Sequence, residues 1–157
     1  MKNNTIVYLA LLFITFLTYQ NLNAQKTTSQ EFNANLAKEL NADDYGMKKY
    51  VMAFLKKGPN RSKDSITRSK LQKAHLGNIK KMAKNGDLVL AGPFLDNGEI
   101  RGIYIFNVET IEEAKKLTET DPLIQSGGLI MELHPWYGSA ATQKIGEIHK
   151  TIQKVKF

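Results

Sequence analysis

The segment at 48–58, KKYVMAFLKKG, restricts the fold of this chain more than any other part of its sequence. Successive side chains of a β-strand point to opposite faces of a sheet. Both alternating sets are apolar here, with Tyr50, Met52 and Phe54 on one face and Val51, Ala53 and Leu55 on the other. Because a small domain rarely leaves a large apolar area in water, we expect both faces of this strand to be covered.

The segments that follow predict the element order βαββαβ. Strand patterns occur at 48–58, 87–94, 100–108 and 129–136, and helix patterns occur at 67–85 and 110–121. Gly86 suits the C-terminal end of the first helix, and Thr110 with Glu113 forms a capping box at the start of the second. Pro122 disfavours a helical conformation at Asp121 and therefore ends the second helix there. This order predicts an α+β domain with the ferredoxin-like fold.

The strand pattern at 100–108, IRGIYIFNV, is also apolar on both faces apart from Arg101 and Asn107, which predicts a central position in the sheet. In a ferredoxin-like fold the two helices cover one face of the sheet and leave the other face open. The open face here would carry large apolar side chains. A second copy of the chain, packed face to face, would cover them, so the sequence predicts a homodimer.

The N-terminal residues 1–24 have the pattern of a secretory signal peptide. Lys2 precedes an apolar run at 6–19, and the segment ends at the small residue Ala24. The run is shorter than the roughly 20 residues of a membrane-spanning helix. We therefore expect cleavage near Ala24, export to the periplasm or the cell exterior, and no membrane attachment afterwards. With no cysteine in the chain, disulfides and thiol catalysis are excluded.

Two flanking segments lie outside the predicted domain at 47–138. Residues 25–46 are mostly polar, with apolar residues at four-residue spacing, and predict a linker that contains a short helix. Residues 139–157 place isoleucines and a valine at heptad-like spacing and predict a C-terminal amphipathic helix. A frayed tail is the alternative, because Gly146 weakens a helix at this point.

Charge and motif content exclude several functional classes. The net charge is +7, but the lysines are dispersed and no basic run alternates with aromatic residues, so we expect no nucleic-acid partner. Arg61 and Lys63 lie on a predicted loop, where they either reach an anionic ligand or are simply solvated. His75, His134 and His149 lack the spacing of metal ligands, and there is no glycine-rich phosphate loop. The sequence predicts neither a metal site nor a cofactor.

His75 is the main candidate for chemistry. It lies in line with Leu71 and Ile79 on the side of the first helix that must face the sheet, and a buried imidazole needs hydrogen-bond partners. Asp121, at the end of the second helix, is expected on the same side of the sheet. A carboxylate on one ring nitrogen would leave the other nitrogen to act as a general base or acid. The alternative is a core histidine that is hydrogen-bonded for structural reasons alone.

Four further residues are candidates for substrate binding. Gly92 and Pro93, in the segment AGPF, are expected to bend a strand and to shape a pocket. His134 and Trp136, near the end of the last strand, are expected to line the same cavity, with Trp136 as an aromatic wall for a planar ligand. Packing at a subunit interface is the alternative role for these last two residues.

The segments FLKKGPN, HLGNIKKMAKNGDLVLAGPFLDNGE, GIYIFNVETIEEAKKLTETDPLIQSG and MELHPWYG resemble the YCII-related (YciI-like) family over about residues 48–138. The resemblance implies a dimeric α+β barrel built from two ferredoxin-like subunits. It also implies that His75 and Asp121 form a catalytic dyad, and that the substrate is a small cyclic or aromatic compound changed by proton transfer. Export is a departure, since many relatives look cytoplasmic.

Together these features lead us to expect a small exported homodimeric enzyme. His75 would act as general base or acid, oriented by Asp121, in an isomerisation or elimination. A non-catalytic module that binds a small molecule in the same cavity is a second possibility. A protein-interaction module that docks a partner through its terminal helices is a third.

Overall fold

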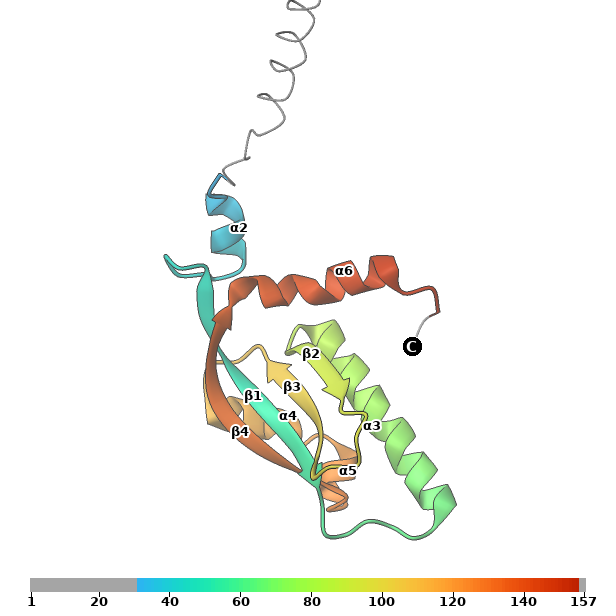
Figure 1. Ribbon diagram of the computed structural model, residues 1–157. Coiled ribbons are helices and arrows are strands. Elements are labelled where there is room, and N and C mark those ends of the chain that lie inside the picture. The colour runs from blue at the N-terminus through green and yellow to red at the C-terminus, as the bar shows by residue number, and fades with distance from the viewer. Residues whose placement is uncertain (1–30, 156–157) are drawn as a thin grey trace, which may run out of the picture. The chain divides into compact units, whose positions relative to one another are not determined.

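The computed structural model describes residues 31–155 (Figure 1). Its elements are α2 (Ala34–Glu39), β1 (Met47–Lys57), α3 (Ser65–Asn85), β2 (Leu88–Pro93), β3 (Ile100–Phe106), α4 (Ile111–Thr118), α5 (Pro122–Gln125), β4 (Leu129–Ser139), the 3-10 helix η1 (Ala140–Lys144) and α6 (Ile145–Ile152). The predicted signal peptide at 1–24 lies outside the described residues. Within residues 31–155 no helix is long and apolar enough to cross a membrane.

The four strands form one antiparallel sheet in the order β2-β3-β1-β4. β1 and β3 are therefore the two central strands, which explains why both of their faces are apolar. Val51 of β1 lies opposite Phe106 of β3 on one side and Pro135 of β4 on the other. This strand order and the crossover positions are those of the ferredoxin-like α+β fold, so the predicted fold class is confirmed.

The hydrophobic core lies between one face of the sheet and the helices α3, α4 and α5, which lie on the same side of it (Figure 1). Val51, Ala53 and Leu55 of β1 supply its centre and are at most 4% exposed. Met82 of α3 and Ala114 of α4 pack onto this strand face. Apolar burial of this kind stabilises the domain and fixes α3 and α4 side by side on the sheet.

Local caps hold the two long helices at defined positions. The side chain of Asp64 accepts a hydrogen bond from the Thr67 N–H at 2.7 Å, so α3 begins at Ser65, two residues before the predicted start. Gly86 ends the same helix in the left-handed conformation, with φ of 84°. Thr110 and Glu113 form the predicted capping box of α4. The helix that carries His75 is thus fixed at both ends.

The opposite face of the sheet is covered only at one end. The 3-10 helix η1 packs on β1 and β2, and α6 packs on β2. Tyr50 lies beneath this segment, is fully buried and donates a hydrogen bond to the Ser139 carbonyl at 3.1 Å. Farther along the same face, Met52, Phe54 and Ile103 are only half-buried. The outer side of α6 is exposed as well, because no residue of this helix is buried.

Candidate active site

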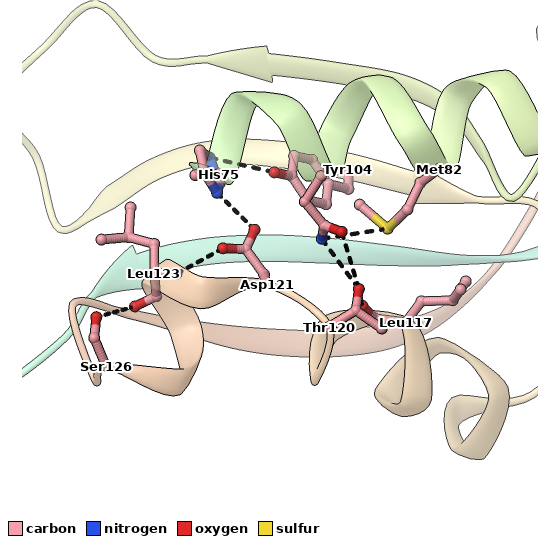
Figure 2. A network of polar contacts seen from close by, with 9 residues as sticks. His75, Met82, Tyr104, Leu117, Thr120, Asp121, Leu123 and Ser126 are labelled. Carbon is pink, nitrogen blue, oxygen red and sulfur yellow. Dashed lines mark hydrogen bonds and ion pairs between the residues drawn. The ribbon is translucent and has the colours of Figure 1, made fainter. Parts of the chain in front are cut away.

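His75 and Asp121 form a buried pair between α3 and the start of α5. His75 Nδ1 lies 2.6 Å from Asp121 Oδ2 (Figure 2). The imidazole is 7% exposed and the aspartate is completely buried. The second carboxylate oxygen of Asp121, Oδ1, accepts a hydrogen bond from the Leu123 N–H at 2.8 Å. Both oxygens are therefore occupied, and the carboxylate is held in one orientation toward the ring.

The local sequence around Asp121 explains its position and corrects the predicted helix end. The helix α4 ends at Thr118, and Asp121 is the N-cap of a separate short helix, α5. Pro122 occupies the first turn of α5, where its fixed φ and missing N–H are favourable. A second contact ties this corner to α3, since the Asn78 amide donates to Thr120 Oγ1 at 3.1 Å. The aspartate is therefore presented to His75 as a helix cap.

The hydrogen bonds around His75 define its tautomer. An ionised carboxylate only accepts hydrogen bonds, so His75 Nδ1 carries the proton that Asp121 receives. In the neutral ring, Nε2 is then the acceptor. The hydroxyl of Tyr104 lies 3.3 Å from Nε2 and is placed to donate to it (Figure 2). The basic nitrogen of His75 thus faces away from Asp121.

Tyr104 is a third member of the site that the sequence analysis did not single out. It is 2% exposed, and its ring lies 6.3 Å from the His75 ring, nearly parallel to it. Burial raises the pKa of the Tyr104 hydroxyl, and the negative charge of Asp121 raises it further. The phenol therefore stays protonated at neutral pH and can act as a donor. The one available signal was that a tyrosine in a central strand needs a partner for its hydroxyl.

A cavity of about 630 Å³ opens beside this group. His75 and Tyr104 line it, whereas Asp121 lies behind His75 and does not. Its walls are formed by α3, the adjoining ends of β2 and β3, the loop after β1 and the segment around α5. The apolar lining consists of Leu55, Leu71, Leu76, Ile79, Leu123 and Leu129. A small molecule in this cavity would meet the imidazole and the phenol with little competing water.

Gly92 and Pro93 line the cavity, where the sequence analysis placed them. Gly92 lies opposite Ile103 and Pro93 lies opposite Gly102 in the pairing of β2 with β3. Gly102 is required for this close pairing, because a Cβ atom there would lie 2.6 Å from the Gly92 carbonyl oxygen. The end of β2 thereby forms one wall of the cavity at backbone level.

The structure does not place His134 and Trp136 beside His75, which corrects their predicted position. In the pairing of β1 with β4, His134 lies opposite Met52 and Trp136 lies opposite Tyr50. Both side chains therefore project from the open face of the sheet, away from α3. The His134 ring packs edge-on against Phe54 with 5.6 Å between centroids, and Trp136 lies 5.6 Å from the Tyr50 ring.

The described part of the chain holds no group of three or more His, Asp or Glu side chains that is arranged to bind a metal ion. His134 Nε2 contacts Glu132 Oε1 at 2.9 Å, but no further ligand joins them among residues 31–155. His75 likewise has one carboxylate and one phenol as neighbours.

The fold and this site define a small α+β protein that holds a buried His–Asp pair beside an apolar cavity. The family model of the YCII-related domain matches residues 49–137, and the chain belongs to this family. No match was found among the curated proteins. Among solved structures the chain is similar to the 5-chloro-2-hydroxyhydroquinone dehydrochlorinase of Burkholderia phenoliruptrix in complex with 2,5-dihydroxybenzoquinone. The two share 19% identity over 55% of this chain and 92% of the other, with a TM-score of 0.42.

Proposed function

We propose that this protein is an enzyme that transfers a proton on a small cyclic or aromatic substrate held in the cavity. The observation that carries the proposal is the 2.6 Å contact between His75 Nδ1 and Asp121 Oδ2, which leaves Nε2 on the side of Tyr104 and the cavity. A buried imidazole that is oriented by a carboxylate and keeps its unprotonated nitrogen beside a cavity has the geometry of a general base.

In the proposed reaction, His75 Nε2 removes a proton from the substrate and becomes part of an imidazolium ion. Asp121 stabilises this cation through the hydrogen bond to Nδ1. The electron pair of the broken bond moves into the ring system of the substrate. The imidazolium then returns the proton at another atom, which gives isomerisation, or a leaving group departs with its bonding electrons, which gives elimination. General base catalysis of this type contributes roughly 10²–10⁴-fold to a rate.

Tyr104 has a defined part in this cycle. Without a bound substrate, the Tyr104 hydroxyl donates to Nε2. When a substrate binds, the hydroxyl turns from Nε2 to an oxygen of the substrate, which frees the single lone pair of Nε2 to take the substrate proton. Its raised pKa keeps the phenol protonated throughout. Tyr104 would therefore stabilise negative charge on the substrate at the moment when His75 becomes positive.

Solvent deuterium exchange tests the proposal even while the reaction product is unidentified. Small cyclic and aromatic carbonyl compounds would be incubated with the protein in D₂O, and loss of C–H signals would be followed by NMR. We expect exchange with the natural protein, and exchange roughly 10²–10⁴-fold slower with the His75→Gln variant, for at least one compound. Equal exchange with both proteins would reject His75 as the base. Binding of a compound without exchange or turnover would instead identify a non-catalytic binding module.

We also propose that a second copy of the chain covers the open face of the sheet. This face exposes part of Met52, Phe54 and Ile103, and the helix η1 protects only one end of it. A face-to-face dimer of two such sheets would bury these side chains. The cavity lies on the other side of the sheet, so each subunit would contain its own His75 and Asp121.

We further propose that the protein is exported, because residues 1–24 have the pattern of a signal peptide. Cleavage of this peptide would make the mature chain begin near residue 25. Amino-terminal sequencing of protein isolated from the cell exterior or periplasm checks this point. An intact amino terminus in the cytoplasmic fraction would reject it.

A further inference from the structure

The arginines of this chain are distributed very differently from its lysines. The chain contains three arginines, Arg61, Arg68 and Arg101, and all three line the cavity beside His75. No lysine of residues 31–155 lines it, although lysines are far more numerous and occur in nearly every other segment. Lysine is sufficient for a solvated surface, whereas the planar guanidinium group is suited to paired hydrogen bonds with an oxyanion. The distribution therefore points to a ligand.

The three arginines come from separate segments that meet at the outer part of the cavity. Arg61 lies on the loop after β1, Arg68 near the start of α3, and Arg101 in β3. Arg61 and Arg68 are exposed and Arg101 is half-buried, whereas His75 is buried. The positive groups are thus at the entrance, and the imidazole is deeper inside.

No acidic side chain in the described part of the chain neutralises these charges. The cavity lining there includes no aspartate or glutamate, and none of the three arginines forms an ion pair within residues 31–155. Asp64 interacts electrostatically with Arg68, but the pKa of this carboxyl is lowered chiefly by its hydrogen bond to Thr67, and Arg68 is the smallest of the contributions. Its carboxylate is engaged as the cap of α3.

Two of the guanidinium groups are held in place by neutral acceptors. Arg68 Nη1 donates to the Lys63 carbonyl at 2.6 Å and to the Ser62 carbonyl at 3.3 Å, and Arg101 Nη1 donates to the Asp96 carbonyl at 3.0 Å. Each guanidinium has five N–H donors, so several remain unused. The backbone carbonyls orient these groups without cancelling their charge, which leaves a preformed anion-binding rim.

We infer that the substrate of this site is an organic acid, namely a small ring compound with a carboxylate or a phosphate monoester group. The oxyanion binds the rim formed by Arg61, Arg68 and Arg101, and the ring extends inward to His75 and Tyr104. This inference rests on the proposed function, since it describes the compound on which His75 acts. Positive charge at the entrance also favours the negative charge that develops on the substrate when its proton is removed.

Binding of matched probes to the full chain tests the inference. The probes are benzoate, phenyl phosphate and the neutral ester methyl benzoate, and the readout is the set of arginine Nε–Hε NMR signals. We expect at least one acid to shift these signals, with an affinity that falls as salt is added, and the ester to leave them unchanged. Comparison of the two acids distinguishes a carboxylate from a phosphate site.

Charge variants provide the decisive comparison. Arg101→Gln and Arg68→Gln should each weaken binding of the preferred acid about 10-fold, as expected for loss of a charge-assisted hydrogen bond. Arg101→Lys keeps the positive charge but loses the planar group that forms two parallel hydrogen bonds with an oxyanion, so it should also weaken binding of the acid. Lys73→Gln is the control, because it removes one positive charge from α3 at a residue that does not line the cavity. It should change the affinity for the acid only slightly, through the lower net charge of the protein.

Equal binding of benzoate and methyl benzoate, no arginine shift with either acid, or an equal loss in Lys73→Gln and Arg68→Gln would overturn the inference. Its failure can be told apart from failure of the proposed function. His75→Gln should retain acid binding and lose deuterium exchange. If an acid binds the arginines but no C–H of it exchanges, the proposed proton transfer is rejected and the anion site is supported. If a neutral compound exchanges without shifting the arginine signals, the proton transfer is supported and the anion site is rejected.

Discussion

Asp121 holds His75 through a 2.6 Å contact although 46 residues separate them in the chain. The contact forms because the aspartate is the N-cap of α5 and the histidine lies on the sheet-facing side of α3. One oxygen of the carboxylate accepts the Leu123 N–H and the other accepts the imidazole N–H. The Asp121 side chain thus caps α5 and is also proposed to orient His75 for catalysis. Substitutions that keep one of these roles and remove the other can distinguish them.

Asp121→Asn should keep the fold but abolish proton transfer. The amide has one acceptor oxygen, and if this oxygen retains the Leu123 N–H, the NH₂ group faces His75 Nδ1. The ring must then accept at Nδ1 and carry its proton on Nε2, which can no longer act as a base. We expect the rate of deuterium exchange to fall roughly 10²–10⁴-fold. The nitrogen shifts of the imidazole in NMR report the tautomer, and an unchanged tautomer with an unchanged rate would contradict this account.

Asp121→Ala should be much more harmful to stability than Asp121→Asn. Alanine removes the cap of α5 and leaves Nδ1–H of the buried imidazole without an acceptor. An unsatisfied buried donor costs about 1–3 kcal/mol in the free energy of unfolding, and loss of the N-cap adds roughly 0.5–2 kcal/mol. Asparagine is itself a good N-cap and should cost far less. Urea unfolding of the two variants measures the difference, and equal losses would show that the cap and the imidazole contact contribute little.

Tyr104→Phe should change how stability depends on alkaline pH. Burial raises the pKa of Tyr104 above its ordinary value of 10.0, and the charge of Asp121 raises it further. The pKa of Tyr104 is thus higher in the folded than in the unfolded state. The protonated phenol therefore contributes its full stabilisation of the fold below the pKa of the unfolded state, and this contribution is lost as the pH rises above that pKa. The natural protein should therefore lose up to about 1.4 kcal/mol more per pH unit above pH 10 than the variant.

Urea unfolding of the natural protein and of Tyr104→Phe between about pH 9 and 11 measures this slope. The other tyrosines are common to both proteins, so the difference isolates Tyr104. Parallel stability curves would mean that the phenol is not buried as the structure has it.

Phe54→Glu should convert the proposed dimer into a monomer. Phe54 lies on the open face of the sheet, where a second subunit would desolvate the new carboxylate without a partner. Ile66→Glu is a matched control, because Ile66 lies on α3 and is 78% exposed. Light scattering coupled to size exclusion gives the masses. A monomeric natural protein, or a dimer that survives Phe54→Glu, would argue against this interface.

Gly102→Ala should lower the stability of the fold much more than Gly92→Ala, even though both glycines line the cavity. A Cβ at position 102 would lie 2.6 Å from the Gly92 carbonyl oxygen, and a strand backbone cannot yield easily. A Cβ at position 92 would meet nothing within 4 Å. Thermal or urea unfolding should show a loss of about 1–3 kcal/mol for Gly102→Ala and less than about 0.5 kcal/mol for Gly92→Ala. The opposite ranking would contradict the pairing of β2 with β3.

The sequence was sufficient to predict the ferredoxin-like fold, because the order of strand and helix patterns leaves few alternatives. A buried imidazole requires a hydrogen-bond partner, and the resemblance to the YCII-related family implied that this partner is Asp121. The position of Asp121 as the cap of α5 was not foreseen, because the turn between α4 and α5 contains no apolar period from which a separate helix could be read.

Other features of the site depend on contacts between distant segments. His134 was expected beside the cavity because it lies near the end of the last strand, and only the pairing with Met52 shows to which face it projects. Arg68 and Arg101 belong to a helix and a strand that are distant in the chain, and only the folded domain shows that both line one cavity. Tyr104 was not recognised because it lies in a mostly apolar strand, where a phenol resembles any other core side chain.

A double-substitution comparison on the rate of deuterium exchange tests the central claim most directly. The claim is that Asp121 acts through His75, so the two residues form one catalytic unit. The rate would be measured for the natural protein, His75→Gln, Asp121→Asn and the variant with both changes, after unfolding curves show that all four are folded. We predict that the double variant is no slower than His75→Gln alone. If the two losses multiply, or if His75→Gln retains the natural rate, the His75–Asp121 pair is not the proton-transfer site.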